Sequence, residues 1–233
     1  MKKPVKLTDQ IAGIPLFHGL TPKHYDELAM IVIDQVVPRG QMIFSQGDEA
    51  TGLYVVISGR VKIFKLSLEG KEQILHLFGA GEPIGEVAVF AGEKFPAYAE
   101  ALEESRLLFF PRPAFIDLIR KYPSAALNML AVLSLRLRKF TSLIEDLSLK
   151  EVPGRLAAHL LYLGEGKKET AEVDLDVSKN QLASLLGTIP ETLSRILARM
   201  SRDGFIELSG QRRIRILDRK GLEELASGEK RLA

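Results

Sequence analysis

The chain lacks cysteine entirely. This absence excludes disulfides, thiolate zinc sites, cysteine nucleophiles and all-cysteine iron–sulfur clusters, because each of them needs a cysteine sulfur. The sequence also has no apolar run of about 18 residues, which a transmembrane helix would need. The N-terminus is basic, but no apolar stretch follows it, so it does not resemble a secretory signal peptide. These absences predict a cytoplasmic protein without a membrane partner.

No charge of one sign dominates the chain either. The 32 lysines and arginines nearly balance the 30 aspartates and glutamates, which leaves a formal net charge of +2 over 233 residues. A nucleic-acid-binding surface would therefore have to be a local basic patch. The chain also lacks a nucleophile–base pair, metal-ligand spacing and a G-x-x-x-x-G-K phosphate loop. The sequence therefore predicts that the protein is not an enzyme.

The stretch from Ser124 to Leu149 contains neither glycine nor proline, and Ser124 can cap its start. Apolar residues recur there in alternating steps of four and three, which is the seam of a coiled coil. A helix of this length would extend about 39 Å and would favour pairing with a second copy of the chain. The alternative is a long helix that packs only on its own domain. The predicted dimerisation residues are Ala126, Leu130, Leu133, Leu137, Phe140, Ile144 and Leu147.

The chain from Val36 to Phe110 has the pattern of short β-strands. Its runs are rich in β-branched and aromatic residues, and glycine-containing turns separate them. This pattern favours a small antiparallel barrel or sandwich, which has room for one small ligand. The five expected strands are 53–57, 61–66, 73–77, 97–101 and 106–110.

Residues 84–90 interrupt this pattern with the pair Gly85-Glu86. They predict a turn that leads into a single helical turn, whose backbone N–H groups can bind an anion or another polar ligand group. On its own, such a pair is more often a loop glycine beside a solvated glutamate. Short helices are also expected after Thr21 and from Pro113.

Residues 178–202 predict a helix-turn-helix. Ser178 and Gln181 fit a capping box at the start of the first helix. Gly187 falls where that helix must stop, because glycine adopts the left-handed conformation at little cost. Thr188 is expected to cap the second helix, which has a proline in its first turn.

The exposed side of the second helix suits the reading of base edges. Glu191 and Arg195 lie one helical turn apart in the half that enters the major groove in this motif. Arginine can bind guanine through two hydrogen bonds, and glutamate can accept one from the cytosine amino group. The alternative is that Glu191 only caps the helix with Thr188 and pairs with Arg195 in solvent. A β-hairpin over 205–217 follows as a wing, and its arginines suit phosphate contacts. The predicted DNA-contacting residues are Glu191, Thr192, Ser194, Arg195, Arg199, Arg212 and Arg213.

Together these features resemble the Crp/Fnr family of bacterial transcription regulators. The resemblance implies an α+β chain with an N-terminal double-stranded β-helix, which is a jelly-roll or cupin-like effector domain. A dimerisation helix and a C-terminal winged helix-turn-helix domain follow. The expected boundaries are 1–123, 124–149 and 150–233, with Pro153-Gly154 as the hinge. The motifs that carry the resemblance are, in order, Gly47-Asp48, Ile57-Ser58-Gly59, Gly85-Glu86, Val152-Pro153-Gly154-Arg155 and Glu191-Thr192-Leu193-Ser194-Arg195.

Departures from the family's patterns narrow the subtype. Cyclic-AMP regulators of the family carry an Arg-Ser pair about ten residues after Gly-Glu, and this pair holds the cyclic phosphate. This chain instead has Lys94-Phe95-Pro96-Ala97-Tyr98, so cyclic AMP is disfavoured. The oxygen-sensing Fnr branch uses N-terminal cysteines, which are absent. The pattern through 95–102 is similar to the nitrosative-stress branch, which regulates denitrification and hybrid-cluster-protein genes.

The resemblance also implies an effector site and raises haem as a cofactor that senses nitric oxide. His18 and His24 are the candidate haem ligands, and no other metal site is expected. A lone histidine is far more often a surface or packing residue than a ligand. The expected effector-binding residues are Gly85, Glu86, Val87, Ala97, Tyr98, Phe140 and Thr141.

We therefore expect a homodimeric, sequence-specific DNA-binding transcription regulator controlled by a small effector in the β-roll. Its expected partners are a second copy, RNA polymerase and double-stranded DNA with a palindromic Fnr-like site. The resemblance implies a TTGAT…ATCAA site, with TTGTGA-like half-sites as the alternative. Another hypothesis is a ligand-binding module that has lost DNA binding and acts through protein partners. The intact exposed residues of the second predicted helix argue against that hypothesis.

Overall fold

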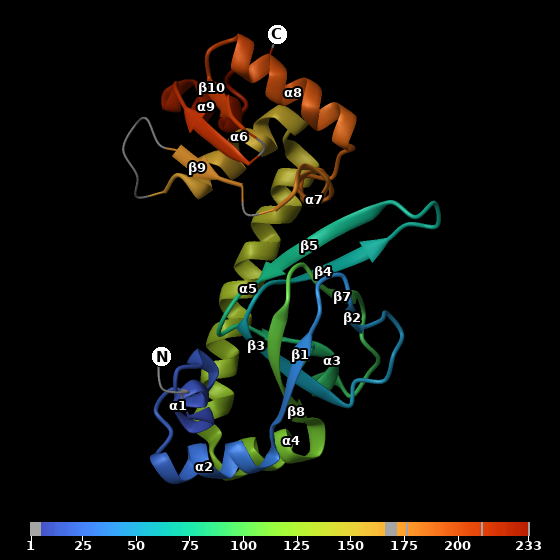
Figure 1. Ribbon diagram of the computed structural model, residues 1–233, viewed down its shortest axis with the longest axis vertical. Coiled ribbons are helices and arrows are strands. Elements are labelled where there is room, and N and C mark those ends of the chain that lie inside the picture. Colours follow the sequence, from blue (N-terminus) through green and yellow to red (C-terminus); the bar gives the residue numbers. More distant parts are fainter. Residues whose placement is uncertain (1–5, 166–171, 176, 211, 233) are drawn as a thin grey trace. The chain divides into compact units, whose positions relative to one another are not determined.

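The structure is a computed structural model that describes residues 6–165, 172–175, 177–210 and 212–232. The chain forms two compact units. The first comprises Met1–Lys71 with Leu75–Arg138, and the second comprises Glu72–Ile74 with Lys139–Ala233. The long helix α5 (Pro123–Leu149), drawn in yellow-green in Figure 1, begins in the first unit and ends in the second. The predicted domain boundaries at 123 and 149 remain predictions.

The first unit contains two four-stranded antiparallel sheets, in the orders β1-β8-β3-β6 and β2-β7-β4-β5. One hydrophobic cluster joins them, because Val56 and Leu107 of one sheet pack with Val61 and Ala99 of the other. This confirms the predicted barrel or sandwich. The strands are β1 (Ile33–Val37), β2 (Met42–Phe44), β3 (Gly52–Ser58), β4 (Val61–Leu66), β5 (Glu72–Phe78), β6 (Pro83–Ile84), β7 (Tyr98–Ala101) and β8 (Ser105–Pro111).

Helices cover the outer face of the first sheet. A second cluster joins Leu53 and Phe110 of the strands to Phe17, Phe115 and Met129 of the surrounding helices, and all five side chains are buried. Helix α2 begins at Pro22 and has the predicted start, because Thr21 and His24 form a reciprocal capping box. The elements that contribute are α1 (Leu7–Ala12), η1 (Pro15–Phe17), α2 (Pro22–Ile31), α4 (Arg112–Lys121) and the first half of α5.

Helix α5 presents two different sides. Ala125, Met129 and Arg136 are its buried residues. Leu130, Leu137 and Ile144 recur every seven residues, and their side chains are 59, 68 and 65% exposed. The other predicted seam residues, Ala126, Leu133, Phe140 and Leu147, are partly buried. Leu133 packs against the core of its own unit, so the exposed apolar stripe is narrower than the predicted seam.

The second unit is a winged helix-turn-helix. A three-stranded antiparallel sheet in the order β10-β11-β9 accompanies four helices. The buried residues Leu182, Leu193, Leu197 and Met200 hold the helix-turn-helix together, and Ala183 is buried where α7 meets α8. The elements are α6 (Val152–Leu163), β9 (Glu172–Asp174), α7 (Lys179–Leu185), α8 (Pro190–Arg202), β10 (Ile206–Ser209), β11 (Arg213–Ile216) and α9 (Arg219–Ser227).

The predicted hinge pair Pro153-Gly154 lies in the first turn of α6, where proline costs no hydrogen bond, and its role as a hinge stays a prediction. A Cβ on Gly154 would lie 2.9 Å from the Leu225 carbonyl oxygen, so this glycine permits the close packing of α6 on α9. Thr188 does not cap α8, because the N-cap is Ile189 and no side-chain hydrogen bond is made there.

The remaining signals at the helix-turn-helix are confirmed. Ser178 accepts a hydrogen bond from the Gln181 backbone N–H and completes the predicted capping box. Gly187 has a φ of +67°, the left-handed conformation that the turn requires. Across the described ranges of the chain, no helix has both the length and the apolar character needed to cross a membrane.

Candidate effector site and nucleic-acid interface

A buried ion pair lies at the start of α3 (Glu86–Ala91). Gly85 precedes it with a φ of +79°, and Glu86 is only 1% exposed. Arg136 of α5 is 9% exposed; its Nη1 donates to Glu86 Oε1, and its Nη2 donates to the Pro83 carbonyl at 2.8 Å. The guanidinium also lies 4.6 Å from the Phe78 ring centroid. Arg136 of α5 thus binds the Gly85-Glu86 turn of the β-roll directly.

Arg136 was missed at the sequence level. It follows Met129 by seven residues and Ala125 by eleven, and both of these are buried on the same side of α5. A charged residue at a core-facing position needs a buried partner. The position of Arg136 on the core-facing side of α5 could have indicated a buried ion pair, although it could not identify Glu86 as the partner.

The second oxygen of Glu86 has no partner. Oε2 is buried and accepts no hydrogen bond from any described residue. A buried carboxylate oxygen without a donor is costly, and a ligand that brings a hydroxyl or N–H group would satisfy it. The site therefore provides an acceptor that is enclosed and available.

Aromatic rings fill the region beside this turn. Phe44 and Phe95 stack with centroids 3.9 Å apart, and Tyr54 stands 6.0 Å from Phe44. A Cβ on Gly85 would meet the Phe95 ring at 2.8 Å, so Phe95 lies directly over the glycine backbone. Burial raises the pKa of the Tyr54 phenol above its ordinary value. The neighbourhood is therefore apolar and poorly hydrated.

The other predicted effector residues fall in different settings. Ala97 is buried, and Tyr98 is partly buried and stacks on Phe64 with centroids 5.3 Å apart. Val87 is exposed on α3. Phe140 and Thr141 belong to the second compact unit, so their assignment to the effector site stays a prediction.

The buried cations of the roll unit are both paired. Arg136 is held by Glu86, and Lys62 Nζ lies 3.3 Å from a Glu100 carboxylate oxygen and 4.3 Å from the Phe64 ring centroid. Each positive charge is thus offset by an adjacent negative one. This arrangement suits a neutral ligand better than a free phosphate.

His18 and His24 do not fit a haem site. His24 Nδ1 accepts a hydrogen bond from the Thr21 backbone N–H at 3.2 Å, and its ring lies 3.7 Å from the Tyr122 ring. Charged Lys121 and Glu27 also pair next to Tyr122. His18 is exposed. The His24 imidazole is therefore engaged by polar and aromatic neighbours, and the exposed His18 lies at the surface, so neither has the enclosed apolar setting of a haem ligand.

We expect Arg136→Met to destabilise the roll unit by about 3–5 kcal/mol, because it leaves the Glu86 carboxylate buried without its cation. Glu86→Gln in the same chain should recover much of that loss, since both charges are then gone. Urea unfolding of the two single variants and the double variant measures this coupling. Additive losses in the double variant would contradict a direct buried pair.

The N-terminal half of α8 presents the predicted reader residues to solvent. Glu191, Ser194, Arg195 and Arg199 are exposed, and Thr192 is partly buried. Arg195 Nη2 donates to the Thr192 hydroxyl at 3.1 Å, which orients the guanidinium along the helix. Exposed polar and charged side chains in this arrangement can form hydrogen bonds to base edges.

Arg155 anchors the helix-turn-helix. Its Nη1 donates to the Leu186 carbonyl at 2.7 Å and its Nε donates to the Lys150 carbonyl at 2.9 Å. It thus satisfies free carbonyls at the ends of α7 and α5. The sequence motif that contains Arg155 has a structural role here, which is to tie the turn to the start of α6.

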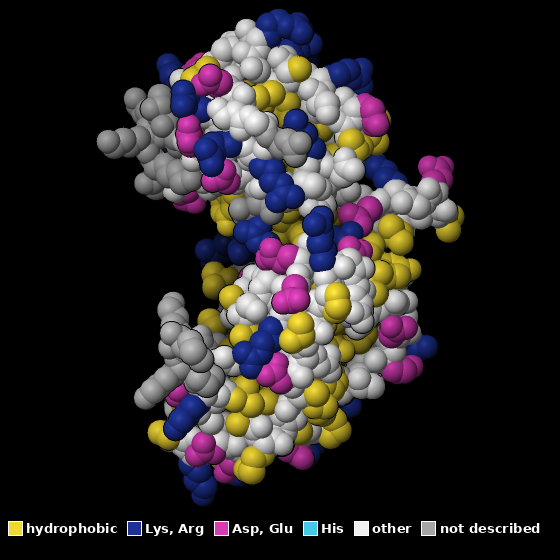
Figure 2. Space-filling view, viewed as in Figure 1, with side chains coloured by type: hydrophobic (Ala, Val, Ile, Leu, Met, Phe, Trp, Pro, Cys, Tyr) yellow, Lys and Arg dark blue, Asp and Glu magenta, His cyan; other side chains and the backbone are white. Residues whose placement is uncertain are grey.

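The wing arginines are partly paired. Arg213 lies 3.2 Å from Asp174, whereas Arg212 is exposed. Arg215 bridges Glu172 and Glu207, and the hydrogen bond to Glu172 and the charges of Glu207 and Glu172 raise the pKa of its guanidinium. Figure 2 shows basic and acidic side chains interspersed over the part of the surface that carries α6 to α9. Charges of both signs are therefore mixed over this face of the second unit (Figure 2).

A two-sheet β-roll, followed by a long helix and a winged helix-turn-helix, is the arrangement of a DNA-binding regulator with an effector-binding domain. Two family models match the chain: the cyclic nucleotide-binding domain over residues 34–122 and the Crp-like helix-turn-helix domain over residues 154–225. The chain belongs to the Crp/Fnr family of transcription regulators. It is a DNA-binding transcription regulator and not an enzyme.

Individual relatives cover most of the chain. It is 36% identical over 216 residues to the cyclic AMP receptor protein of Thermus thermophilus, covering 93% of this chain and 98% of that protein. It is 30% identical over 219 residues to the fumarate and nitrate reduction regulatory protein of Vibrio cholerae, covering 90% and 87%. A solved CooA variant of Carboxydothermus hydrogenoformans shares the fold with a TM-score of 0.76, at 22% identity and coverage of 96% and 97%.

Proposed function

We propose that the protein acts as a homodimer that binds a palindromic, Fnr-like DNA site through the N-terminal half of α8. The observation that carries this proposal is the exposed position of Glu191, Ser194 and Arg195 around the partly buried Thr192, which accepts a hydrogen bond from Arg195. Arg195 then binds a guanine through two hydrogen bonds, and Glu191 accepts from a cytosine amino group. Arg199, Arg212 and Arg213 contact phosphates and set the register.

Selection of bound sequences from a random duplex library tests this proposal. We expect enrichment of a two-fold palindrome of the TTGAT…ATCAA type, with half-sites about one helical turn apart. Enrichment of TTGTGA-like half-sites would still support a dimer, but one with a different half-site sequence. A library without any enriched sequence would support a module that acts through protein partners instead.

The dimer interface of this proposal is the exposed stripe of α5. Leu130, Leu137 and Ile144 repeat every seven residues, so they form one straight row on the helix. A second copy is the natural occupant, because a heptad stripe is self-complementary about a two-fold axis. The partly buried Ala126, Leu133, Phe140 and Leu147 flank this row. A palindromic DNA site requires the same two-fold symmetry.

The effector proposal rests on Glu86 and Arg136. Glu86 Oε2 has no hydrogen-bond donor among the described residues, so a ligand can supply one. Arg136 links Glu86 to α5, where it precedes Leu137 of the proposed seam, so ligand binding at Glu86 can change the position of α5. A ligand that changes this pair shifts the preferred placement of α5 and so the spacing of the two α8 helices. The remaining expected site residues are Gly85, Val87, Ala97, Tyr98, Phe140 and Thr141.

We further propose that the effector is not cyclic AMP. Phe95 stacks on Phe44 within the roll, and both buried cations of the unit are already paired. An aromatic ring cannot neutralise a cyclic phosphate. The likeness of residues 95–102 to the nitrosative-stress branch points to a gene set of that kind, with RNA polymerase as the protein partner. The histidine geometry gives haem no support.

Cyclic AMP should leave the melting temperature of the protein unchanged at millimolar concentration, because Arg136 and Lys62, the buried cations among the described residues of the roll, already face carboxylates. Differential scanning fluorimetry with cyclic AMP and a panel of neutral, donor-bearing aromatic compounds makes the comparison. Glu86→Gln is the matched control, since it removes the acceptor charge and should abolish any shift that a true ligand causes. A clear stabilisation by cyclic AMP would overturn this effector assignment.

A further inference from the structure

We propose that the C-terminal tail, Gly228–Leu232, is an additional DNA-binding element in which Leu232 positions the tail and Arg231 binds a backbone phosphate. This proposal rests on the proposed reading of DNA by α8. All residues that carry it belong to the second compact unit. Nothing in the sequence pattern of the helix-turn-helix or of the wing pointed to this tail.

The tail is fixed at its beginning. Gly228 ends α9 with a φ of +84°, and the Lys230 backbone N–H donates to the Glu224 carbonyl at 3.0 Å. The Lys230 ammonium lies 3.7 Å from the Glu224 carboxylate and 4.9 Å from the Phe205 ring centroid. The Lys230 ammonium is therefore paired within the protein, and its backbone hydrogen bond fixes where the following residues begin.

Leu232 then lies against the reader helix. It lines a hollow of about 240 Å³ together with Pro153 and four α8 residues, and it is partly buried there. These α8 residues follow the spacing i, i+3, i+4 and i+7, so they form one side of the helix. They are Thr192, Arg195, Ile196 and Arg199, and three of them are predicted DNA contacts.

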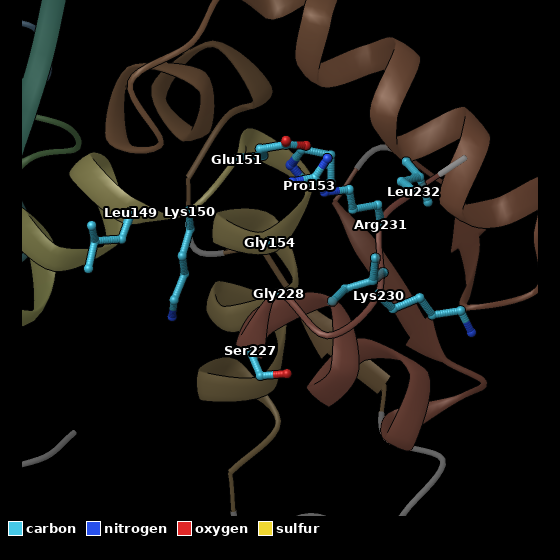
Figure 3. Close-up of a pocket in the computed structure, with 11 residues that line it drawn as sticks. Leu149, Lys150, Glu151, Pro153, Gly154, Ser227, Gly228, Lys230, Arg231 and Leu232 are labelled. Carbon is cyan, nitrogen blue, oxygen red and sulfur yellow. The ribbon is translucent and has the colours of Figure 1, made fainter.

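Arg231 lines a second hollow, which shares Leu232 and Pro153 with the first. The second hollow, of about 160 Å³, lies between the tail and the start of α6, and Figure 3 shows Arg231 and Leu232 beside Pro153 and Glu151. Arg231 is exposed and makes no hydrogen bond or ion pair with any described residue, Glu151 included. Its guanidinium is therefore available to an outside anion.

The charges around this side of α8 favour a polyanion as the ligand. Arg195 and Arg199 line the first hollow and Arg231 lines the second, and Leu232 and Pro153 line both, so three positive charges lie around adjoining hollows. Leu232 is partly buried in the first hollow and so fixes the neighbouring Arg231 on this side of the unit. Because Arg195 and Arg199 remain exposed with the tail in place, the tail adds to the reader surface and does not cover it. A phosphate contact positions the protein without specifying bases.

The test uses Arg231→Gln in the full-length protein and fluorescence anisotropy on a selected operator and on an unrelated duplex, from 50 to 200 mM salt. We expect weaker binding to both duplexes by the same factor. The slope of log affinity against log salt should become shallower by about 1 for each subunit. For each phosphate interaction that the substitution removes, the loss of affinity relative to the unaltered protein should be about threefold smaller at 200 mM salt than at 50 mM.

Two further variants complete the test. Leu232→Ala keeps every charge and should give a smaller weakening, because Arg231 is then no longer held in place. Lys220→Gln removes the same charge from the first turn of α9, which lines neither hollow, and should change nothing. Thermal melting of each variant verifies that the fold is retained.

Three results would overturn the proposal. Unchanged affinity and salt slope in Arg231→Gln would exclude a phosphate contact. Tighter binding after Leu232→Ala would mean that the tail covers α8 instead. If the unaltered protein bound no duplex at all, the proposed function itself would fail, and that outcome differs from a defect confined to the tail variants.

Discussion

Arg195→Ala will weaken discrimination between the palindromic operator and unrelated DNA. Arg195 is exposed on the N-terminal half of α8 and is oriented by its hydrogen bond to Thr192, so its loss removes two hydrogen bonds to a guanine in each half-site. The expected cost is about 1–3 kcal/mol per subunit on the operator. Anisotropy titrations with operator and unrelated duplexes measure it.

The matched control for this variant is Lys220→Ala, which removes a positive charge from α9 of the same unit. A general charge effect would weaken operator and unrelated DNA equally in both variants. Loss of operator binding alone, and only in Arg195→Ala, assigns the guanine contact. Unchanged operator affinity in Arg195→Ala would exclude α8 as the reader in the proposed register.

Leu137→Glu will convert the protein to monomers. Leu137 lies midway between Leu130 and Ile144 in the exposed stripe of α5, and two copies of the new carboxylate would meet at the two-fold axis. Burying such a charge without a partner costs several kcal/mol. Operator affinity should fall by about 100-fold or more, because the two half-sites are then bound independently. Sedimentation velocity and anisotropy give the two readouts.

Leu135→Glu is the matched control, because Leu135 is 60% exposed on the same helix but lies about 200° around it from Leu137. It makes the same substitution at nearly the same exposure. It should leave the dimer intact. Dissociation of both variants would point to damage to α5 itself, and a dimeric Leu137→Glu would place the interface elsewhere.

Local signals in the sequence predicted the elements well. Thr21 before Pro22 marks the start of α2, the Ser178–Gln181 capping box starts α7, and Gly187 ends it in the left-handed conformation. Each of these depends on hydrogen bonds or sterics within a few residues, so the chain carries the information locally. The strand pattern likewise predicted the two-sheet roll.

Local sequence signals did not predict features that depend on packing between distant segments. Thr188 had the chemistry of a cap, but α8 starts one residue later and leaves Ile189 at that position. Gly154 was considered only as part of a hinge, yet α9 packs so closely on α6 that a Cβ at this position would lie 2.9 Å from the Leu225 carbonyl oxygen. Neither constraint is visible in the residues nearby.

The effector site shows the limit most clearly. Gly85-Glu86 was predicted from its turn, but Arg136 is 50 residues away and enters only because its side of α5 packs on the roll. The orphaned Glu86 oxygen follows from this geometry and from nothing in the sequence. The tail beside α8 is a contact of the same kind, formed between distant segments.

In the proposed complex, Arg195 reads a guanine in each half-site of a palindrome. The most direct measurement is a double-mutant cycle of Arg195→Ala against operators in which that guanine is replaced in both half-sites. We expect strong coupling between Arg195 and this guanine. The base change should cost the unaltered protein about 1–3 kcal/mol of binding free energy per half-site, and it should cost Arg195→Ala almost nothing. Equal, additive losses would contradict it.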